Sequence, residues 1–268
     1  MLFNYLLIYL FWDVDENKFY TMKLKKTLSC LLIIISTFLI AQSNLKISYK
    51  YEYNWKNAPN YTVPSLLKMS EDKSLFIIDH SRNGFNDEEL EANNIIQVKS
   101  KNNFVAYFKD YLKDTIYYDN VIEFRHFPTK DPIQIFNWEL TNQTKNVLGY
   151  ECQRAVVHHF GRTYHAFFTT ELGFTHGGPW KFDGLPGVIL EVYSLDNEFK
   201  ITATQIQLKN EDIIIDNPYK ETKKFIDFKE YQRLYQQKYK EANKTEINAD
   251  GSTSSESMPK CQIECLVD

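Results

Sequence analysis

The sequence lacks several features that would each point to a function. Lysine and arginine total 31 against 35 aspartates and glutamates, so there is no basic excess of the kind that binds nucleic acids. No G-x-S-x-G segment is present, which removes the nucleophile elbow of the α/β-hydrolases. No internal repeat is evident, and only nine glycines occur in 268 residues. These absences favour a single acidic domain over a nucleic-acid-binding protein or a repeat array.

A long apolar run occurs only near the N-terminus. Three lysines between Met22 and Lys26 precede the apolar segment 28–40, and Ala41-Gln42-Ser43 follows it. The run is shorter than the roughly 20 residues that a membrane-spanning helix needs. The layout is that of a secretory signal peptide over residues 22–42.

Residues 1–21 do not fit this layout. We interpret them as an upstream extension that a mis-called start adds before Met22; a tandem membrane anchor is the alternative. We therefore expect an exported protein in the periplasm or associated with the outer membrane. After signal cleavage it is not expected to be an integral membrane protein.

Three cysteines remain after cleavage: Cys152, Cys261 and Cys265. An oxidising compartment permits one disulfide among them, and the sequence leaves the pairing open. The two tail cysteines have a three-residue gap, unlike the two-residue gap of redox and zinc motifs.

From residue 44 onward, short runs alternate apolar and polar side chains, beginning with LKISYKYEYNW. Such alternation is typical of half-buried strands. Similar runs recur at 74–79, 94–100, 104–110, 114–119, 121–127 and 133–140. Their close spacing predicts antiparallel strands joined by turns. The fold class is therefore mainly β, with a single curved antiparallel sheet or incomplete barrel in a domain over 44–243.

The C-terminal part changes character. Asp227 with Glu230 three residues later forms a capping box, and apolar residues follow at helical spacing. We predict an amphipathic helix over 228–243 that packs on the sheet. Residues 244–268 begin with a small, polar stretch, and we predict a disordered tail there.

Four of the six histidines lie between residues 158 and 176. If Phe160 and Gly161 are the two central residues of a hairpin turn, His158 and His165 are diagonal neighbours on one face. A three-residue loop would separate them. His158, His165 and His176 are therefore weak candidates for a metal site, with hydrogen-bonded strand histidines as the alternative. No cofactor is expected.

The stretch GGPWKFDGLPGVILEVYS, residues 177–194, concentrates glycine and proline. Because Gly187 leads into an apolar strand and not into a helix, the stretch is not a phosphate-binding loop. It predicts a double corner that buries Trp180 and Phe182, with Gly187 at positive φ. Glu171, Asp183 and Glu191 flank it and would suit acid–base work, but their separation cannot be read from sequence.

The segment from 149 to 194 resembles the signature of the GLPGLI family, the Porphyromonas gingivalis-type family of exported Bacteroidetes proteins. The signature turn is carried by Gly178, Pro179, Trp180, Phe182, Gly184, Leu185, Pro186 and Gly187. The resemblance implies export and a curved antiparallel sheet similar to that of periplasmic lipoprotein carriers. It implies no established activity.

These observations predict a cell-envelope protein that is not an enzyme. We expect non-enzymatic binding of a lipid, a peptide or an outer-membrane protein on a concave aromatic face. The alternatives are a periplasmic metal-binding protein that uses the clustered histidines, and a hydrolase.

Overall fold

The computed structural model describes residues 44–54, 60–81, 104–209, 213–243, 246–247, 253–254 and 258–267. The expected extension at 1–21, the signal peptide at 22–42 and the expected strand at 94–100 lie outside these ranges. All described residues belong to one compact unit, Ser43–Asp268.

The described elements are β1 (Asn44–Tyr53), β2 (Tyr61–Met69), β3 (Lys73–Asp79), β4 (Phe104–Asp110), the 3₁₀ turn η1 (Tyr111–Lys113), β5 (Thr115–Ile122), β6 (Arg125–Asp131), β7 (Glu139–Val147), β8 (Tyr150–His159), β9 (Arg162–Thr169), β10 (Val188–Ser194), β11 (Phe199–Lys209), α4 (Phe228–Ala242), β12 (Glu246–Ile247) and β13 (Thr253–Ser254).

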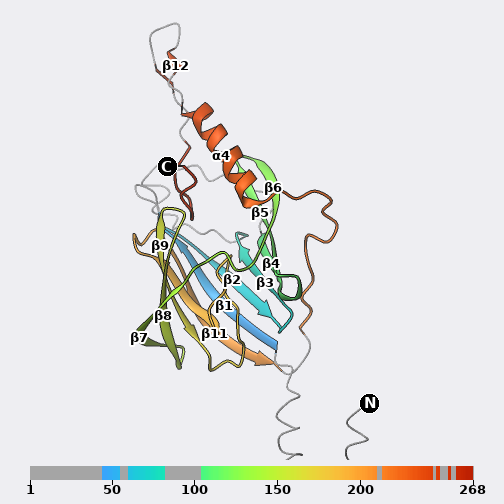
Figure 1. Ribbon diagram of the computed structural model, residues 1–268, viewed down its shortest axis with the longest axis vertical. Helices are drawn as coiled ribbons and strands as arrows, with labels where there is room; N and C mark the ends of the chain where they lie inside the picture. Colours follow the sequence, from blue (N-terminus) through green and yellow to red (C-terminus); the bar gives the residue numbers. More distant parts are fainter. Residues whose placement is uncertain are drawn as a thin grey trace, which may run out of the picture. The chain divides into compact units, whose positions relative to one another are not determined.

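Eleven strands form one antiparallel sheet in the order β6-β5-β4-β3-β2-β1-β11-β10-β9-β8-β7 (Figure 1). The chain begins at the middle of the sheet with β1 and runs outward to the β6 edge. It resumes at the opposite edge with β7 and returns inward until β11 pairs with β1. The sheet is open, with β6 and β7 as its edges. The predicted mainly β fold with a single antiparallel sheet is confirmed.

Alternating burial explains the central strands. Leu45 and Ile47 of β1 are fully buried, and Tyr49 is 1% exposed, because every second side chain points to the same face. The pairing of β1 with β11 shifts register between Ser48 and Tyr49. An extra residue of this kind bends a strand and increases its twist, which curves the sheet.

The segment that connects the two sheet edges differs from the prediction. A strand was expected over 133–140, but β7 begins only at Glu139. Ile133 and Phe136 are the buried residues of the connection. Their spacing of three does not match the period of two that a strand requires, so this segment packs on the sheet without pairing with it.

Helix α4 begins as predicted. The Asp227 side chain accepts a hydrogen bond from Glu230 N at 2.7 Å, which satisfies one backbone donor of the first turn. Phe228, Tyr231 and Tyr235 are buried. The helix packs beside β5 and β6 (Figure 1). Among the described residues, no helix has the length and apolar character to span a bilayer.

The C-terminal end differs from the predicted disordered tail. Residues 258–267 are described and contact the domain, with Glu264 7% exposed and Leu266 3% exposed. Cys261 and Cys265 form a disulfide. The small, polar composition that predicts disorder applies to the residues before this segment, whereas the disulfide-closed turn and its apolar neighbours pack.

Candidate functional site

The glycine-rich stretch forms the loop that joins β9 to β10, residues 177–187, here called the β9–β10 loop. Trp180 is 2% exposed and Phe182 is fully buried. Gly187 has φ +149°, and a Cβ built on it would overlap the Thr169 carbonyl oxygen and lie 2.8 Å from the carbonyl carbon. Glycine is therefore required by close backbone approach. The predicted corner with Gly187 at positive φ is confirmed.

A buried ion pair attaches this loop to β4. Lys109 Nζ lies 2.9 Å from Asp183 Oδ2 and donates to the carbonyls of Gly178 and Phe182 at 3.1 and 2.7 Å. The Asp183 carboxylate also accepts from Tyr111 OH at 3.0 Å and from Gly184 N at 2.8 Å. Every proton of the ammonium group has an acceptor, which is the condition under which a charge can be buried.

A second buried lysine, Lys181, belongs to the β9–β10 loop itself. Its Nζ forms an ion pair with Glu264, and His159 Nε2 lies 3.4 Å from Glu264 Oε1. Burial raises the pKa of Glu264, but the Lys181 ammonium group and the His159 hydrogen bond outweigh it and hold that pKa below its usual value. The carboxylate is thus kept ionised inside the domain.

Aromatic rings surround the Lys181 ammonium group. Its Nζ lies 4.1 Å from the ring centroid of Phe228, 4.5 Å from that of Trp180 and 5.3 Å from that of Tyr118. A cation over aromatic faces gains electrostatic stabilisation when it is desolvated. The ion pair and the rings form one buried, aromatic-walled site.

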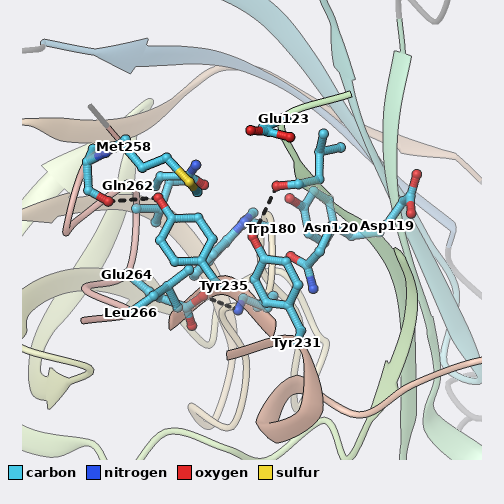
Figure 2. A pocket seen from close by; sticks show the side chains of 15 residues that line it. Asp119, Asn120, Glu123, Trp180, Tyr231, Tyr235, Met258, Gln262, Glu264 and Leu266 are labelled. Atoms are coloured by element: carbon cyan, nitrogen blue, oxygen red, sulfur yellow. Dashed lines mark hydrogen bonds and ion pairs between the residues drawn. The ribbon is translucent and has the colours of Figure 1, made fainter. Parts of the chain in front are cut away.

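The β9–β10 loop contributes residues to the walls of two cavities. The first, about 440 Å³ in volume, is lined by Trp180 and Lys181 from the loop, by β5, by α4 and by the C-terminal segment. Figure 2 shows Asp119, Asn120 and Glu123 on one side of it and Met258, Gln262 and Glu264 on the other. The second, about 480 Å³, is lined by Asp183 to Pro186 together with Tyr111 and His176.

Polar side chains contribute to the lining of the first cavity. Trp180, Tyr231 and Tyr235 are 2%, 3% and 0% exposed, so their faces are covered and cannot stack on a ligand. Tyr231 OH and Tyr235 OH already donate to backbone carbonyls (Figure 2). Asp119 Oδ1 is a buried acceptor with no hydrogen-bond partner among the described residues. A hydroxyl or amide donor would satisfy it.

The second cavity has carboxylate and phenol groups at its base. Tyr111 OH donates to Asp183, and the Ser74 hydroxyl lies 3.1 Å from Tyr111 OH. Burial and the Asp183 charge raise the pKa of Tyr111 well above its ordinary value. The His176 ring lies against Tyr111, with centroids 3.8 Å apart. All of these groups have partners, so the arrangement is structurally satisfied.

The predicted histidines are not brought into one site. Phe160 and Gly161 are the two turn residues, with φ of 42° and 69°, and His158 pairs with Thr163. His158 and His165 are therefore diagonal neighbours, as the two-residue turn predicts. His165 contacts Arg154 Nη2 and Tyr193 OH.

His176 lies elsewhere, in the second cavity. No group of three or more potential metal ligands occurs in the part of the chain that the structure describes. The three histidines remain separate hydrogen-bonded side chains.

The flanking carboxylates are also separated. Asp183 pairs with Lys109, whereas Glu191 pairs with Lys145 at 2.6 Å. Glu171 accepts from a backbone N–H of β8. Of the three cysteines, Cys261 and Cys265 form a disulfide, and Cys152 is free and buried.

Sequence reasoning missed both buried lysines. One signal was present for Lys109: in β4 it shares a face with Val105 and Tyr107, the inward face of the strand. For Lys181 the signal was its position between Trp180 and Phe182, two residues predicted to be buried. Neither signal identifies the partner, because Asp183 and Glu264 come from other parts of the chain.

Part of the chain matches a known protein family. The family model described as "N-glycanase peptide, N-terminal domain" matches residues 125–233. Two crystal forms of PNGF-II are similar in structure, each with 16% sequence identity, with TM-scores of 0.46 and 0.44. They cover 72% of this chain and 33% and 32% of their own, so the chain spans about a third of their length. The comparison with curated proteins gives no match.

This match corrects the resemblance to the GLPGLI family. That resemblance depended on a glycine- and proline-rich corner, and such a corner is a general way to turn a chain tightly into a strand. The family model that matches residues 125–233, the corner included, is instead that of the N-glycanase N-terminal domain.

The match also corrects the expected function. A non-enzymatic role was expected from an open aromatic face, but Trp180, Phe182 and Tyr118 are at most 2% exposed. The alternation predicts which aromatic side chains face inward, but it does not predict that a loop covers them. The family model that matches is described as an N-glycanase domain, and a hydrolase was the alternative expectation.

Proposed function

We propose that this chain acts in the removal of N-linked glycans from proteins, as a domain of an N-glycanase-like hydrolase. The observation that carries the proposal is the family match over residues 125–233. The matched segment contains the whole β9–β10 loop and the first residues of α4. It therefore supplies Trp180, Lys181 and Tyr231, which line the first cavity.

The reaction defines what such a site must offer. An N-glycanase hydrolyses the side-chain amide of a glycosylated asparagine. Water adds to the amide carbonyl, the bond from carbon to nitrogen breaks, and the nitrogen leaves on the sugar with a proton. The asparagine becomes aspartate. A base must activate the water, and an acid must protonate the leaving nitrogen.

We assign substrate contact to the first cavity. Asp119, Asn120 and Glu123 line one side of it with oxygen and nitrogen atoms (Figure 2). Sugar hydroxyls and the peptide amide are hydrogen-bonding groups that suit the polar side chains of Asp119, Asn120 and Glu123. Asp119 and Glu123 are also carboxylates of the cavity that can accept a proton from water.

The test is glycan release from a glycopeptide with one Asn-linked glycan. We expect the purified chain to convert the glycosylated asparagine to aspartate, detected by mass spectrometry of the peptide and of the free sugar. Asp119→Asn and Glu123→Gln, which preserve shape, should each lower the rate on the order of 100-fold if the carboxylates act in proton transfer. Glu139→Gln is the matched control, since Glu139 is exposed on the edge strand β7 and lines neither cavity.

Two results would contradict the proposal. One is a chain that neither binds nor cleaves the glycopeptide. The other is release that Asp119→Asn and Glu123→Gln reduce no more than Glu139→Gln does, which would remove the first cavity from the reaction.

The location of the protein in the cell is a further part of the proposal. The Cys261–Cys265 disulfide is compatible with export to an oxidising compartment. We propose the periplasm or the outer membrane as the site of action. Fractionation of the native cells tests this: recovery of the protein in the cytoplasm would contradict it.

A further inference from the structure

The C-terminal segment is bound to the domain in the way that a peptide ligand is bound. Arg162 Nη1 donates to the carbonyl oxygens of Gln262 and Ile263 at 2.6 and 3.1 Å. Tyr164 OH also donates to the Ile263 carbonyl. These contacts bind the backbone carbonyls of Gln262 and Ile263 and would accept other side chains at both positions.

The groups that make these contacts are held in place independently of the segment. Arg162 Nε lies 3.1 Å from Asp196 Oδ2, and Arg162 Nη2 lies 2.6 Å from Glu198 Oε2. Both acids belong to the turn between β10 and β11. The guanidinium group is thus oriented before it meets residues 262–264, which is what a preorganised binding site requires.

The charged side chain of the segment that enters the domain is Glu264. Glu264 reaches the ion pair with Lys181 and the contact with His159, while Gln262 stays exposed. A lysine that is 2% exposed and walled by aromatic rings is costly to bury without a carboxylate partner. The site around Lys181 is therefore built for an anion.

The disulfide fixes the segment in its bound shape. Cys261 and Cys265 enclose residues 262–264 in a small ring, which lowers the ordering cost of binding. Both cysteines are partly exposed, so a reductant can reach them. Without the ring, ordering residues 262–264 costs more free energy, so the disulfide shifts the balance toward the bound segment.

We propose that Lys181, His159, Arg162 and Tyr164 form a binding site for an acidic peptide segment with a glutamate side chain. The chain's own residues 262–264 fill this site while the disulfide is intact. A dithiol reductant gives two electrons and two protons to the disulfide, which becomes two thiols, and is itself oxidised to a disulfide. The segment then withdraws, and the site and the first cavity open together. The segment also lines the first cavity, so this switch bears on the substrate site proposed above, but the lysine reactivity measured below does not require glycan release.

The experiment measures the reactivity of single lysines toward an amine-specific ester in the full chain, with mass spectrometry of the peptides. Lys109 is the internal control, because it is equally buried but is held by Asp183 and not by the C-terminal segment. With the disulfide intact, both lysines should react much more slowly than Lys229, which is exposed. After reduction, or in the Cys261→Ser, Cys265→Ser variant, the Lys181 rate should rise at least about tenfold while Lys109 stays protected.

A peptide probe then tests the site itself. The synthetic peptide of residues 259–267, closed by its own disulfide, is added to the double-serine variant without reductant. We expect it to restore the protection of Lys181. The same peptide with glutamine in place of its glutamate is the matched control and should not protect.

Each other outcome overturns the proposal. If Lys181 stays protected without the disulfide, the disulfide does not control access. If Lys181 and Lys109 become reactive together, the domain has opened as a whole. If the peptide gives no protection, or the glutamine peptide protects equally, the site does not bind the carboxylate.

Discussion

Lys109 and Asp183 are 74 positions apart in the chain, yet their charged atoms lie 2.9 Å from each other with side chains only 1% and 2% exposed. The pair attaches the β9–β10 loop to strand β4. The ammonium group also donates hydrogen bonds to two loop carbonyls, so several contacts fix the position of the loop. The loop is therefore fixed in position where its residues line the two cavities.

Removing both partners of this pair should cost less than the sum of the two single removals. Lys109→Met leaves a buried carboxylate and two carbonyls without their donor, and we expect a loss of about 3–5 kcal/mol in the free energy of unfolding. Asp183→Asn should cost a similar amount. The double variant should lose less than the sum of the two, as measured by urea denaturation. Additive losses would show that the two groups do not interact.

Substitution of Gly187 tests the close approach of the β9–β10 loop to β9. Gly187→Val should prevent folding or greatly lower the folded yield, because its Cβ meets the Thr169 backbone. Gly149→Ala is the control, since Gly149 has φ +93° but no atom within 4 Å of the added Cβ. It should cost about 1–3 kcal/mol from backbone strain alone. Equal thermal stability of the two variants would contradict this explanation.

His165 should make stability depend on pH. Burial, and then the Arg154 charge, lower its pKa below the ordinary 6.5. The folded state therefore binds fewer protons than the unfolded state, and stability rises with pH in this range. The contribution is complete above pH 6.5 and is lost as the pH falls toward the folded-state pKa.

The measurement is the free energy of unfolding against pH for His165→Asn. Its slope below pH 6.5 should be shallower than that of the native protein. His80, whose pKa burial also lowers, retains its share of the slope in both. An unaltered slope in His165→Asn would show that another group titrates.

Phe160 occupies a turn position that suits asparagine or glycine better, with φ +42°. Its ring packs edge-on against Phe228 of α4, with centroids 5.0 Å apart. We expect Phe160→Asn to relieve the backbone but to lower the melting temperature, because the loss of the ring contact, about 0.5–1.5 kcal/mol beyond area burial, outweighs the gain. A higher melting temperature would show that relief of the turn strain outweighs the lost ring contact.

The period of apolar residues was sufficient to predict much of the fold. Alternation predicted β1, β3 and β4, but it also predicted one strand over 121–127, where β5 ends and β6 begins, and a strand over 133–140 that is wrong. The capping box at Asp227 and Glu230 predicted where α4 begins. The register of the hairpin at Phe160-Gly161 followed from turn chemistry. In the hairpin of β10 and β11, Val192 pairs with Ile201 and Tyr193 with Lys200, so the two strands are spaced equally about Asp196 and Asn197. Each of these signals is local, since the residues that carry it are neighbours in the chain.

The candidate site was not predictable in the same way. The sequence by itself determined that the 177–187 stretch is a tight corner, because glycine and proline restrict the backbone wherever they stand. Only the tertiary structure decided that Lys109 meets Asp183 and that Lys181 meets Glu264. These pairs join residues from distant segments, and no periodicity records which buried charge will find which partner. The physical reason is that backbone geometry is encoded locally, whereas a buried charge is stabilised by whichever opposite charge the completed fold brings beside it.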